Sequence, residues 1–384
     1  HVFDDAWEQR KLSELIIEYK KTVGSDCTLP ILTSSKTEGV ILQEDHFGRK
    51  QNHDITGYNI LPRNYCTYRN RSDGVDFTFN INRCCDKGII SKFYPVFCGN
   101  NCDIFFISLV LNNSNEVVRE IGYTCTGTGQ KVLSFLDLQK MKIRVPKYEE
   151  QKRIASYIET LDNLINLHQR KFEKLTNVKK SMLEKMFPKD GADVPEVRFK
   201  GFTGPWERRK FGDVFEEYSE KNRADLPPLT IIQGSGTIRR DESERALQYD
   251  KASLSNYKVV NEGDLIVHLR SFEGGLEKAN SQGIISPAYH TFHGEGVDSR
   301  FYYTYFRSKN FIDTDLKPHV YGIRDGRSID IEGMKTIEIP FTSYPEQKLI
   351  GDAIDSINTL ISLQRRELEK LQSIKKALLE KMFV

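Results

Sequence analysis

Two short polar loops, one in each half of the chain, carry side chains of the kinds that hydrogen-bond to the edges of nucleic-acid bases. The loops lie at residues 67–74 and 268–275, each between an apolar segment and a copy of the sequence Gly-Ile-Ile-Ser. Arginine can bridge two acceptors of guanine, asparagine can bridge adenine, and glutamate can accept from cytosine. We predict base contacts from Tyr68, Arg69, Asn70 and Arg71 in the first loop, and from His268, Arg270, Ser271 and Glu273 in the second. The alternative for each residue is an ordinary solvated loop position.

A second polar loop follows in each half, at residues 124–131 and 321–327. Glycine allows backbone N–H groups to approach a phosphate, and lysine or arginine can complete the contact. The candidates are Gln130 and Lys131 in the first half, and Tyr321, Arg324 and Arg327 in the second. A plain turn explains these loops equally well.

The chain lacks the motifs of common catalytic and nucleotide-binding sites. It contains no G-x-x-x-x-G-K-[ST] loop, no G-x-G-x-x-G motif, no G-x-S-x-G elbow, no H-E-x-x-H pair and no Asn-Pro-Pro-aromatic segment. We therefore predict that the chain is not an enzyme and that it has no catalytic residues.

The cysteines do not suggest a metal site. All seven lie in the first half, at Cys27, Cys66, Cys84, Cys85, Cys98, Cys102 and Cys125. No paired C-x-x-C spacing occurs, and a related second half manages without any cysteine. We predict free, mostly buried thiols and no bound metal.

The elements that position the loops are indicated by an internal repeat. Residues 148–154 return at 344–350, and residues 179–187 return at 375–383, so the offset is 196 in both cases (344 − 148; 383 − 187). Trp7-Glu8 likewise returns as Trp206-Glu207. A period near half the chain length predicts a tandem duplication of one domain and one helix.

Both copies of this repeat contain a long helical pattern. Residues 149–187 contain no glycine and no proline, and apolar side chains alternate at spacings of four and three in both copies. Such heptads predict coiled-coil helices of roughly 55 to 60 Å. Polar residues interrupt the seam at matching positions, His168 with Gln364 and Lys179 with Lys375, which is typical of side chains that fix register.

The predicted fold class is α+β, with two similar mixed α/β globular domains separated by two long antiparallel coiled-coil helices in a pseudo-twofold arrangement. The predicted boundaries are domain 1 at 1–147, helix 1 at 148–187, a linker at 188–204, domain 2 at 205–343 and helix 2 at 344–384. We expect strands at 229–232, 257–260 and 264–267, and a helix at 301–317.

Charge and hydropathy limit the partners. The formal net charge is only +2 and the mean hydropathy is −0.51. No apolar run approaches the ~18 residues that span a bilayer, so we expect a cytoplasmic protein without a membrane partner. A protein that binds nucleic acid alone is usually more basic, so a partner subunit is expected to supply much of the phosphate contact.

With these motifs in view, the chain resembles the specificity (S) subunit of type I restriction-modification systems. The resemblance rests on the two Trp-Glu pairs, on the strand endings from Met141 to Pro146 and from Met334 to Pro340, and on the Glu-Gln-Lys segment that opens each helix. It covers essentially the whole chain.

The resemblance implies two target recognition domains, each reading one half of a split double-stranded DNA site, with the helices setting the spacer. It also implies docking of two methyltransferase subunits and, in the full complex, of restriction subunits. The chain itself would bind no cofactor; S-adenosylmethionine, ATP and Mg²⁺ would be used by the partner subunits.

Two other classes of function remain open on the sequence. A coiled-coil scaffold whose globular domains bind proteins would explain the heptads and the near-neutral charge, but not loops that vary inside a repeated frame. An enzyme such as a nuclease would have to act on DNA as the purified chain alone.

Overall fold

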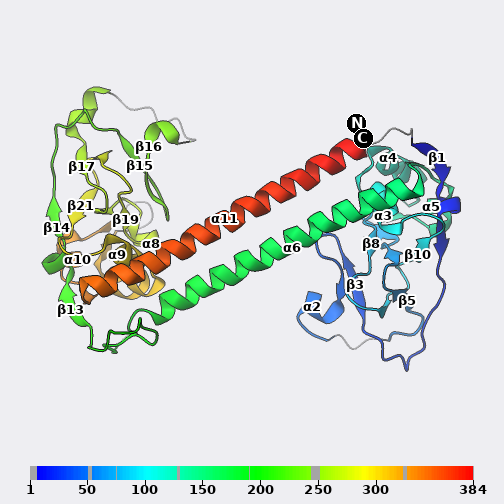
Figure 1. Cartoon of the computed structure of the whole chain (residues 1–384), viewed down its shortest axis with the longest axis horizontal. Helices are drawn as coiled ribbons and strands as arrows, with labels where there is room; N and C mark the ends of the chain where they lie inside the picture. The colour runs from blue at the N-terminus through cyan, green and yellow to red at the C-terminus, as the bar shows by residue number, and fades with distance from the viewer. Residues whose placement is uncertain are drawn as a thin grey trace. The chain divides into compact units, whose positions relative to one another are not determined.

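The structure is a computed structural model that describes residues 7–50, 54–74, 76–127, 130–189, 191–243, 251–322 and 327–383. The chain folds into two compact units (Figure 1). Unit 1 comprises His1–Gln169 and Glu367–Val384, and unit 2 comprises Arg170–Arg366. Each unit therefore contains a globular part and a segment of both long helices.

The long helices are α6 (Tyr148–Lys185) and α11 (Tyr344–Met382). Within unit 1, Ile154 and Ile158 of α6 are buried in one cluster with Leu378 of α11 against it. Within unit 2, the same kind of cluster joins Met182 of α6 to Ile350 of α11. In each unit the two helix segments run antiparallel, as Figure 1 shows, and the seam residues that the heptads predict face the partner helix or the core.

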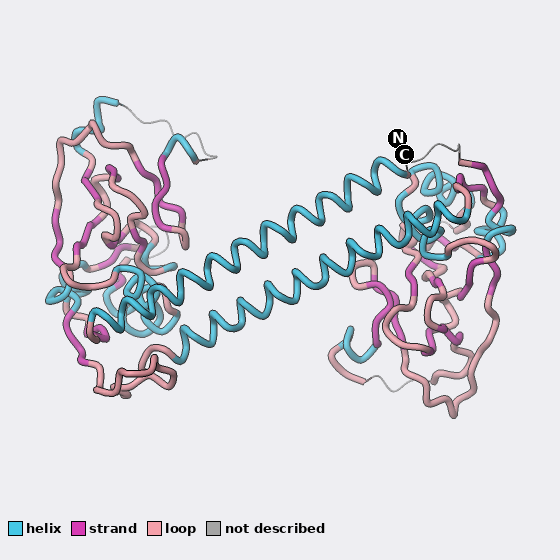
Figure 2. The backbone as a smooth tube through the Cα atoms, in the orientation of Figure 1, coloured by secondary structure: helices cyan, strands magenta, loops and turns pink. Residues whose placement is uncertain are grey.

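Unit 1 is built from short antiparallel strands with helices packed beside them (Figure 2). Its strands are β1 (Glu8–Lys11), β2 (Ile16–Glu18), β3 (Leu32–Ser35), β4 (Gly39–Leu42), β5 (Asn59–Pro62), β6 (Cys66–Thr67), β7 (Arg71–Ser72), β8 (Asn80–Ile81), β9 (Lys87–Ile90), β10 (Val96–Gly99), β11 (Lys131–Val132) and β12 (Lys142–Val145). Its short helices are α1 (Leu12–Leu15), α2 (Gln43–Phe47), α3 (Ile104–Asn113), α4 (Asn115–Thr124) and α5 (Phe135–Lys140).

Unit 2 has strands β13 (Glu207–Lys210), β14 (Glu216–Tyr218), β15 (Leu229–Ile232), β16 (Gly236–Arg239), β17 (Lys258–Val260), β18 (Leu265–Val267), β19 (Glu277–Lys278), β20 (Gly283–Ile285), β21 (His290–His293), β22 (Val320–Tyr321), β23 (Ser328–Ile329) and β24 (Glu338–Phe341). Its short helices are α7 (Phe211–Val214), α8 (Ser271–Gly274), α9 (Ser299–Phe306) and α10 (Ile331–Lys335), with 3-10 turns η1 (Arg240–Glu242), η2 (Lys251–Asn256) and η4 (Lys317–His319) and a π-helical turn η3 (Phe311–Leu316).

Most strands of unit 2 pair in the same order as those of unit 1, the exceptions being the pairs β7-β11 and β22-β23. The four-stranded sheet β2-β10-β6-β8 corresponds to β14-β21-β18-β19, and the strand pair β1-β12 corresponds to β13-β24. The hairpins β3-β4 and β15-β16 also correspond, as do the pairs β5-β9 and β17-β20. The same framework therefore presents different loops in the two units.

An aromatic cluster fixes the end of a long helix to each globular part. In unit 1, Phe383 after α11 lies 5.9 Å from Trp7 and 5.9 Å from Phe106, measured between ring centroids. In unit 2, Phe187 after α6 lies 6.1 Å from Trp206 and 5.0 Å from Phe301. Edge-to-face and tilted pairs of this kind add roughly 0.5–1.5 kcal/mol each beyond their buried area. The repeated Trp-Glu and Met-Phe motifs are therefore packing motifs.

Four of the sequence expectations meet clear outcomes. The strand predicted at 229–232 is confirmed, and those at 257–260 and 264–267 each begin one residue later. The helix predicted at 301–317 is confirmed only in part, because α9 ends at Phe306 and, after a break at residues 307 and 308, a π-helical turn and a 3-10 turn follow. The Ser308 side chain accepts from the backbone N–H of Phe311 at 3.2 Å, and such local bonds compete with helix continuation.

The seven cysteines are free, but the expectation that most are buried is wrong. Only Cys66 and Cys102 are buried, while Cys84 is exposed. In the described part of the chain, no helix is both long enough and apolar enough to cross a membrane.

Candidate nucleic-acid interface

Unit 1 contains a cleft of about 370 Å³, here called cleft 1. Its lining combines the tip of the β3-β4 hairpin with the first predicted loop and includes Ser34, Lys36, Arg69, Arg71, Ser72, Asp73, Gly74, Asp76, Phe77, Thr78, Tyr94 and Gln130. Arg69, Arg71 and Gln130, which the sequence places in two separate loops, line the same cleft.

Strand pairing brings these two loops together. Arg71 pairs with Val132 and Ser72 with Lys131 across β7 and β11. The backbone N–H of Leu133 also donates to the carbonyl of Asn70 at 3.0 Å. The pairing of β7 with β11 therefore joins the first predicted loop to the end of the second, next to Gln130.

Both basic and acidic side chains line cleft 1. Lys36 forms an ion pair with Asp76, and the Lys36 and Ser72 hydrogen bonds lower the pKa of the Asp76 carboxyl. Arg69 and Arg71 are exposed, and neither forms an ion pair with any residue that the structure describes. Arg71 instead lies over the ring of Phe93, 4.7 Å from its centroid. Both guanidinium groups can bind an acceptor from outside.

Unit 2 contains a larger cleft of about 830 Å³, here called cleft 2. It lies between the β15-β16 hairpin and the second predicted loop and is lined by Thr230, Ile231, Ile232, Gln233, Ile238, Glu242, Ser243, His268, Leu269, Arg270 and Tyr289. Leu269 is 65% exposed at its mouth. Its walls are more apolar than those of cleft 1.

A buried carboxylate shapes the hairpin tip beside cleft 2. Glu277 is fully buried and accepts from the backbone N–H groups of Gly234 at 2.8 Å and Gly236 at 3.1 Å. Gly236 has φ of +77°, and a Cβ there would lie 2.5 Å from the carbonyl oxygen of Lys278. Arg307 forms an ion pair with Glu277 and so offsets the charge of the carboxylate. The tip is therefore held rigidly by the core.

His268 is neutral at physiological pH. Burial, followed by the nearby Arg307 and Arg270 guanidinium groups, lowers the pKa of His268 to about 4. Its Nδ1 accepts from the backbone N–H of Arg270 at 3.3 Å, which assigns the proton to Nε2. Nε2 is buried and has no hydrogen-bond partner among the described residues. An unpartnered donor beside a cleft is suited to a base acceptor.

Two predicted base contacts are wrong. Tyr68 is fully buried and donates its hydroxyl to the carbonyl of Leu133 at 3.1 Å, and burial raises its pKa well above the ordinary value. Ser271 is also fully buried, and its hydroxyl accepts from the backbone N–H of His268 at 2.9 Å. Both side chains support the loop from beneath and cannot reach a ligand in the cleft.

The other described candidates do not line the clefts. Glu273 forms ion pairs with Arg270 at 3.3 Å and with Arg327 at 3.4 Å, which joins the two predicted loops of unit 2. Tyr321 is 59% exposed on β22. Lys131 donates to the carbonyl of Gly127 at 3.0 Å. Arg324 falls outside the described residues.

Asn70 is partly buried at the edge of cleft 1. Its backbone N–H donates to the carbonyl of Phe93 at 2.9 Å, and its side-chain oxygen is buried without a partner among the described residues. A rotation of this side chain would be needed for the adenine contact that the sequence predicts.

The loop motifs did not reveal the contribution of the hairpins. Lys36 in cleft 1 and Gln233 in cleft 2 come from the β3-β4 and β15-β16 hairpins. Tyr94 and Tyr289 were also missed, although a signal exists: each stands three residues after the serine of Gly-Ile-Ile-Ser, so their offset of 195 (289 − 94) equals that of the motif. A search for residues that keep the motif's offset would have found them.

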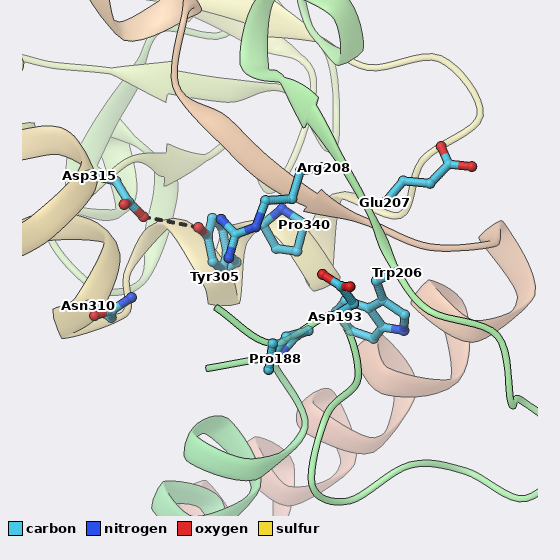
Figure 3. Close-up of a pocket in the computed structure, with 10 residues that line it drawn as sticks. Pro188, Asp193, Trp206, Glu207, Arg208, Tyr305, Asn310, Asp315 and Pro340 are labelled. Carbon is cyan, nitrogen blue, oxygen red and sulfur yellow. Dashed lines mark hydrogen bonds between the residues drawn. The ribbon is translucent and has the colours of Figure 1, made fainter. Parts of the chain in front are cut away.

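A third cavity, in unit 2, is too small for a ligand. It has a volume of about 20 Å³ and lies beside Pro188, Asp193 and Trp206 (Figure 3). A space of this size holds about one water molecule. Figure 3 also shows Tyr305 donating to Asp315, at 3.1 Å. Among the described residues, no three His, Cys, Asp or Glu side chains cluster so as to hold a metal ion.

Comparison with known proteins shows what the chain is similar to. Residues 5–177 match the family described as the type I restriction modification DNA specificity domain. A solved S subunit of a type I restriction-modification system from M. genitalium has the same fold, with a TM-score of 0.59 over 100% of this chain and 98% of that chain, at 12% identity.

Two relatives from Methanocaldococcus jannaschii are similar in sequence. The putative type I restriction enzyme MjaX specificity subunit is 25% identical over 65% of this chain and 60% of its own length, and the type I restriction enzyme MjaVIII specificity subunit is 27% identical over 66% and 64%. The chain thus aligns with less than two thirds of the length of each. These matches make the chain similar, over part of its length, to specificity subunits of type I restriction enzymes.

Proposed function

We propose that this chain is the sequence-specific DNA-recognition subunit of a type I restriction-modification complex, and that each globular unit reads one half of a bipartite site. The observation that carries the proposal is the pair of clefts, built at corresponding places of one framework but lined by different side chains. The repeated framework gives two recognition surfaces of similar geometry. Different linings give two different half-sites.

The chemistry of the clefts supports DNA as the ligand. The unpaired guanidinium groups of Arg69 and Arg71 match the acceptors of guanine, and Gln130 can bridge adenine. Arg270 and the Nε2 donor of His268 offer corresponding contacts in unit 2. The proposed recognition domains are 1–147 and 205–343, related by tandem duplication and joined through the linker at 188–204.

The long helices, at 148–187 and 344–384, are proposed to set the spacer between the half-sites and to dock two methyltransferase subunits. Apolar side chains remain exposed on them, including Tyr157 and Leu167 on α6 and Leu360 and Leu363 on α11. Exposed apolar side chains in rows are typical of a surface that a partner covers.

The chain is proposed to be non-catalytic and to bind no cofactor. In this proposal S-adenosylmethionine is bound by the methyltransferase subunits, and ATP and Mg²⁺ are used by restriction subunits in the full complex. The DNA and these partners would place the chain in the cytoplasm.

The test is to express the chain with its methyltransferase subunits and to determine the methylated motif across the genome of the host. A split motif with a fixed spacer is expected, and the purified complex should prefer a duplex that carries it. If no motif is methylated and the complex shows no duplex preference, the protein-binding scaffold becomes the better description. Purified chain alone should neither cut nor methylate DNA.

A further inference from the structure

One cation in unit 2 lacks the partner that its counterpart in unit 1 has. Lys179 and Lys375 are 196 residues apart (375 − 179), and so are Asp162 and Asn358 (358 − 162). In unit 1, Lys375 Nζ donates to the Asp162 carboxylate at 2.5 Å. In unit 2 the corresponding carboxylate is replaced by the amide of Asn358. Lys179 forms no ion pair or hydrogen bond with any residue that the structure describes.

Lys179 is nevertheless not a free surface lysine. Its side chain is half-buried, whereas the adjacent Lys180 is exposed. Burial and the nearby Arg307 guanidinium both lower the pKa of the Lys179 ammonium. Partial removal of a cation from water without an anion costs free energy, and an incoming anion would recover it.

The carboxylate that pairs with Arg307 already has several other partners. Glu277 accepts from two backbone N–H groups of the hairpin tip and from the Tyr303 hydroxyl at 2.9 Å, besides its ion pair with Arg307. It therefore offsets the charge of Arg307. No carboxylate among the described residues forms an ion pair with Lys179, so its ammonium can take an anion from outside the chain.

Lys179 lies beside the elements that build cleft 2. Arg307 acts electrostatically on Lys179 and also on His268, which lines the cleft. The Arg307 guanidinium lies 3.2 Å from the position that a Cβ on Gly234 would take at the hairpin tip. An anion that reaches Lys179 is thus close to any ligand held in cleft 2.

We propose that Lys179 binds a backbone phosphate of the DNA whose bases are read at cleft 2, an inference that rests on the proposed function. Phosphates accompany every base at a fixed distance, and a lysine ammonium binds them as a point charge without regard to sequence. The adjoining cleft, with Arg270 and the Nε2 donor of His268, favours this source over a carboxylate of a partner protein.

The test uses the complex with its methyltransferase subunits and a duplex that carries the methylated motif. Binding is measured between about 50 and 200 mM salt, because each phosphate contact contributes about 0.9 to the slope of log K against log salt. Lys179→Gln removes the cation. Asn358→Asp keeps the lysine but supplies the carboxylate that unit 1 has. Lys375→Gln is the matched control, because the Lys375 ammonium is already paired with the Asp162 carboxylate.

Lys179→Gln and Asn358→Asp are each expected to lower the salt slope by about 0.9 and to weaken binding roughly 5- to 10-fold at 0.1 M salt, for matching and unrelated duplexes alike. Asn358→Asp should also raise the melting temperature, which separates its effect on binding from loss of fold. Lys375→Gln should lower the melting temperature and leave the slope unchanged.

An unchanged slope in both unit 2 variants overturns the proposal. The proposal is also overturned if Lys179→Gln loses methyltransferase binding while the salt slope of DNA binding is unchanged. In that case Lys179 binds a carboxylate of the methyltransferase subunit. A wild-type complex without preference for its motif overturns the proposed function as well, and this result does not depend on Lys179.

Discussion

The side-chain carbonyl of Gln347 accepts a hydrogen bond of 2.9 Å from the backbone N–H of Asp298. Gln347 is fully buried in the first turn of α11, and its Nε2 donates to the carbonyl of Thr342 at 2.7 Å. Asp298 in turn caps α9 through its carboxylate. Unit 1 repeats the arrangement, since Gln151 accepts from the N–H of Asp103 at 3.0 Å. The glutamine of the Glu-Gln-Lys motif therefore anchors each long helix to its globular part.

Loss of this anchor should destabilise unit 2. We expect Gln347→Ala to lower the free energy of unfolding by about 2–4 kcal/mol, because it leaves one buried N–H and one buried carbonyl unpaired. Urea unfolding of the purified complex or chain measures the change. The exposed neighbour Lys348 is the control, and its replacement by alanine should cost no more than about 0.5 kcal/mol. Equal small losses in both variants would show that the anchor contributes little.

Each cleft arginine should affect one half-site only. We expect Arg71→Ala to weaken binding by about 1–3 kcal/mol and to relax the base preference in the half-site read by unit 1. Arg270→Ala should do the same for the other half-site. Binding is compared on duplexes that carry one changed base pair in either half. Arg63→Ala is the control, because Arg63 pairs with Asp86 outside the lining of cleft 1. The assignment fails if either cleft variant weakens both half-sites equally.

Stability should depend on pH through His268. The folded-state pKa is about 4, below the ordinary value of 6.5, so between these values the unfolded chain binds a proton that the folded chain does not. The stability contribution is therefore present above pH 6.5 and is lost as pH falls toward 4. Partial exposure limits the effect at pH 5 to roughly 1–2 kcal/mol. Urea unfolding at pH 7 and pH 5 measures it. His268→Gln should flatten this difference, and an unaltered pH dependence in the variant would assign it elsewhere.

The length of the two long helices should set the length of the spacer between the half-sites. Insertion of one heptad into α6 and a matching heptad into α11 adds roughly 10 Å, or about three base pairs, while the seam keeps its register. The methylated motif of the variant should keep its bases and gain about three positions in its spacer. Insertion into α6 alone should disrupt the paired seam and serves as the control. A motif with the original spacer would exclude the helices as the source of the spacing.

The candidate site was only partly predictable. The loop at 67–74 was identified from residue types, and Arg69 and Arg71 do line cleft 1. Tyr68 was included wrongly, because one residue along an irregular loop changes a side chain from exposed to buried, and no periodicity marks that change. The pairing of β7 with β11, which joins two loops about sixty residues apart in the chain, is a long-range contact without a local signature.

The sequence by itself determined the elements whose signals are local or repeated. The heptads of α6 and α11 were visible because i, i+3 and i, i+4 neighbours share a helix face, and the 196-residue offset identified the motifs that hold those helices. Only the tertiary structure decided whether residues at corresponding positions of the two repeats have the same neighbours. Among the described residues Lys375 has a carboxylate partner and the equivalent Lys179 has none, because a residue's electrostatic environment is set by chain segments distant in sequence.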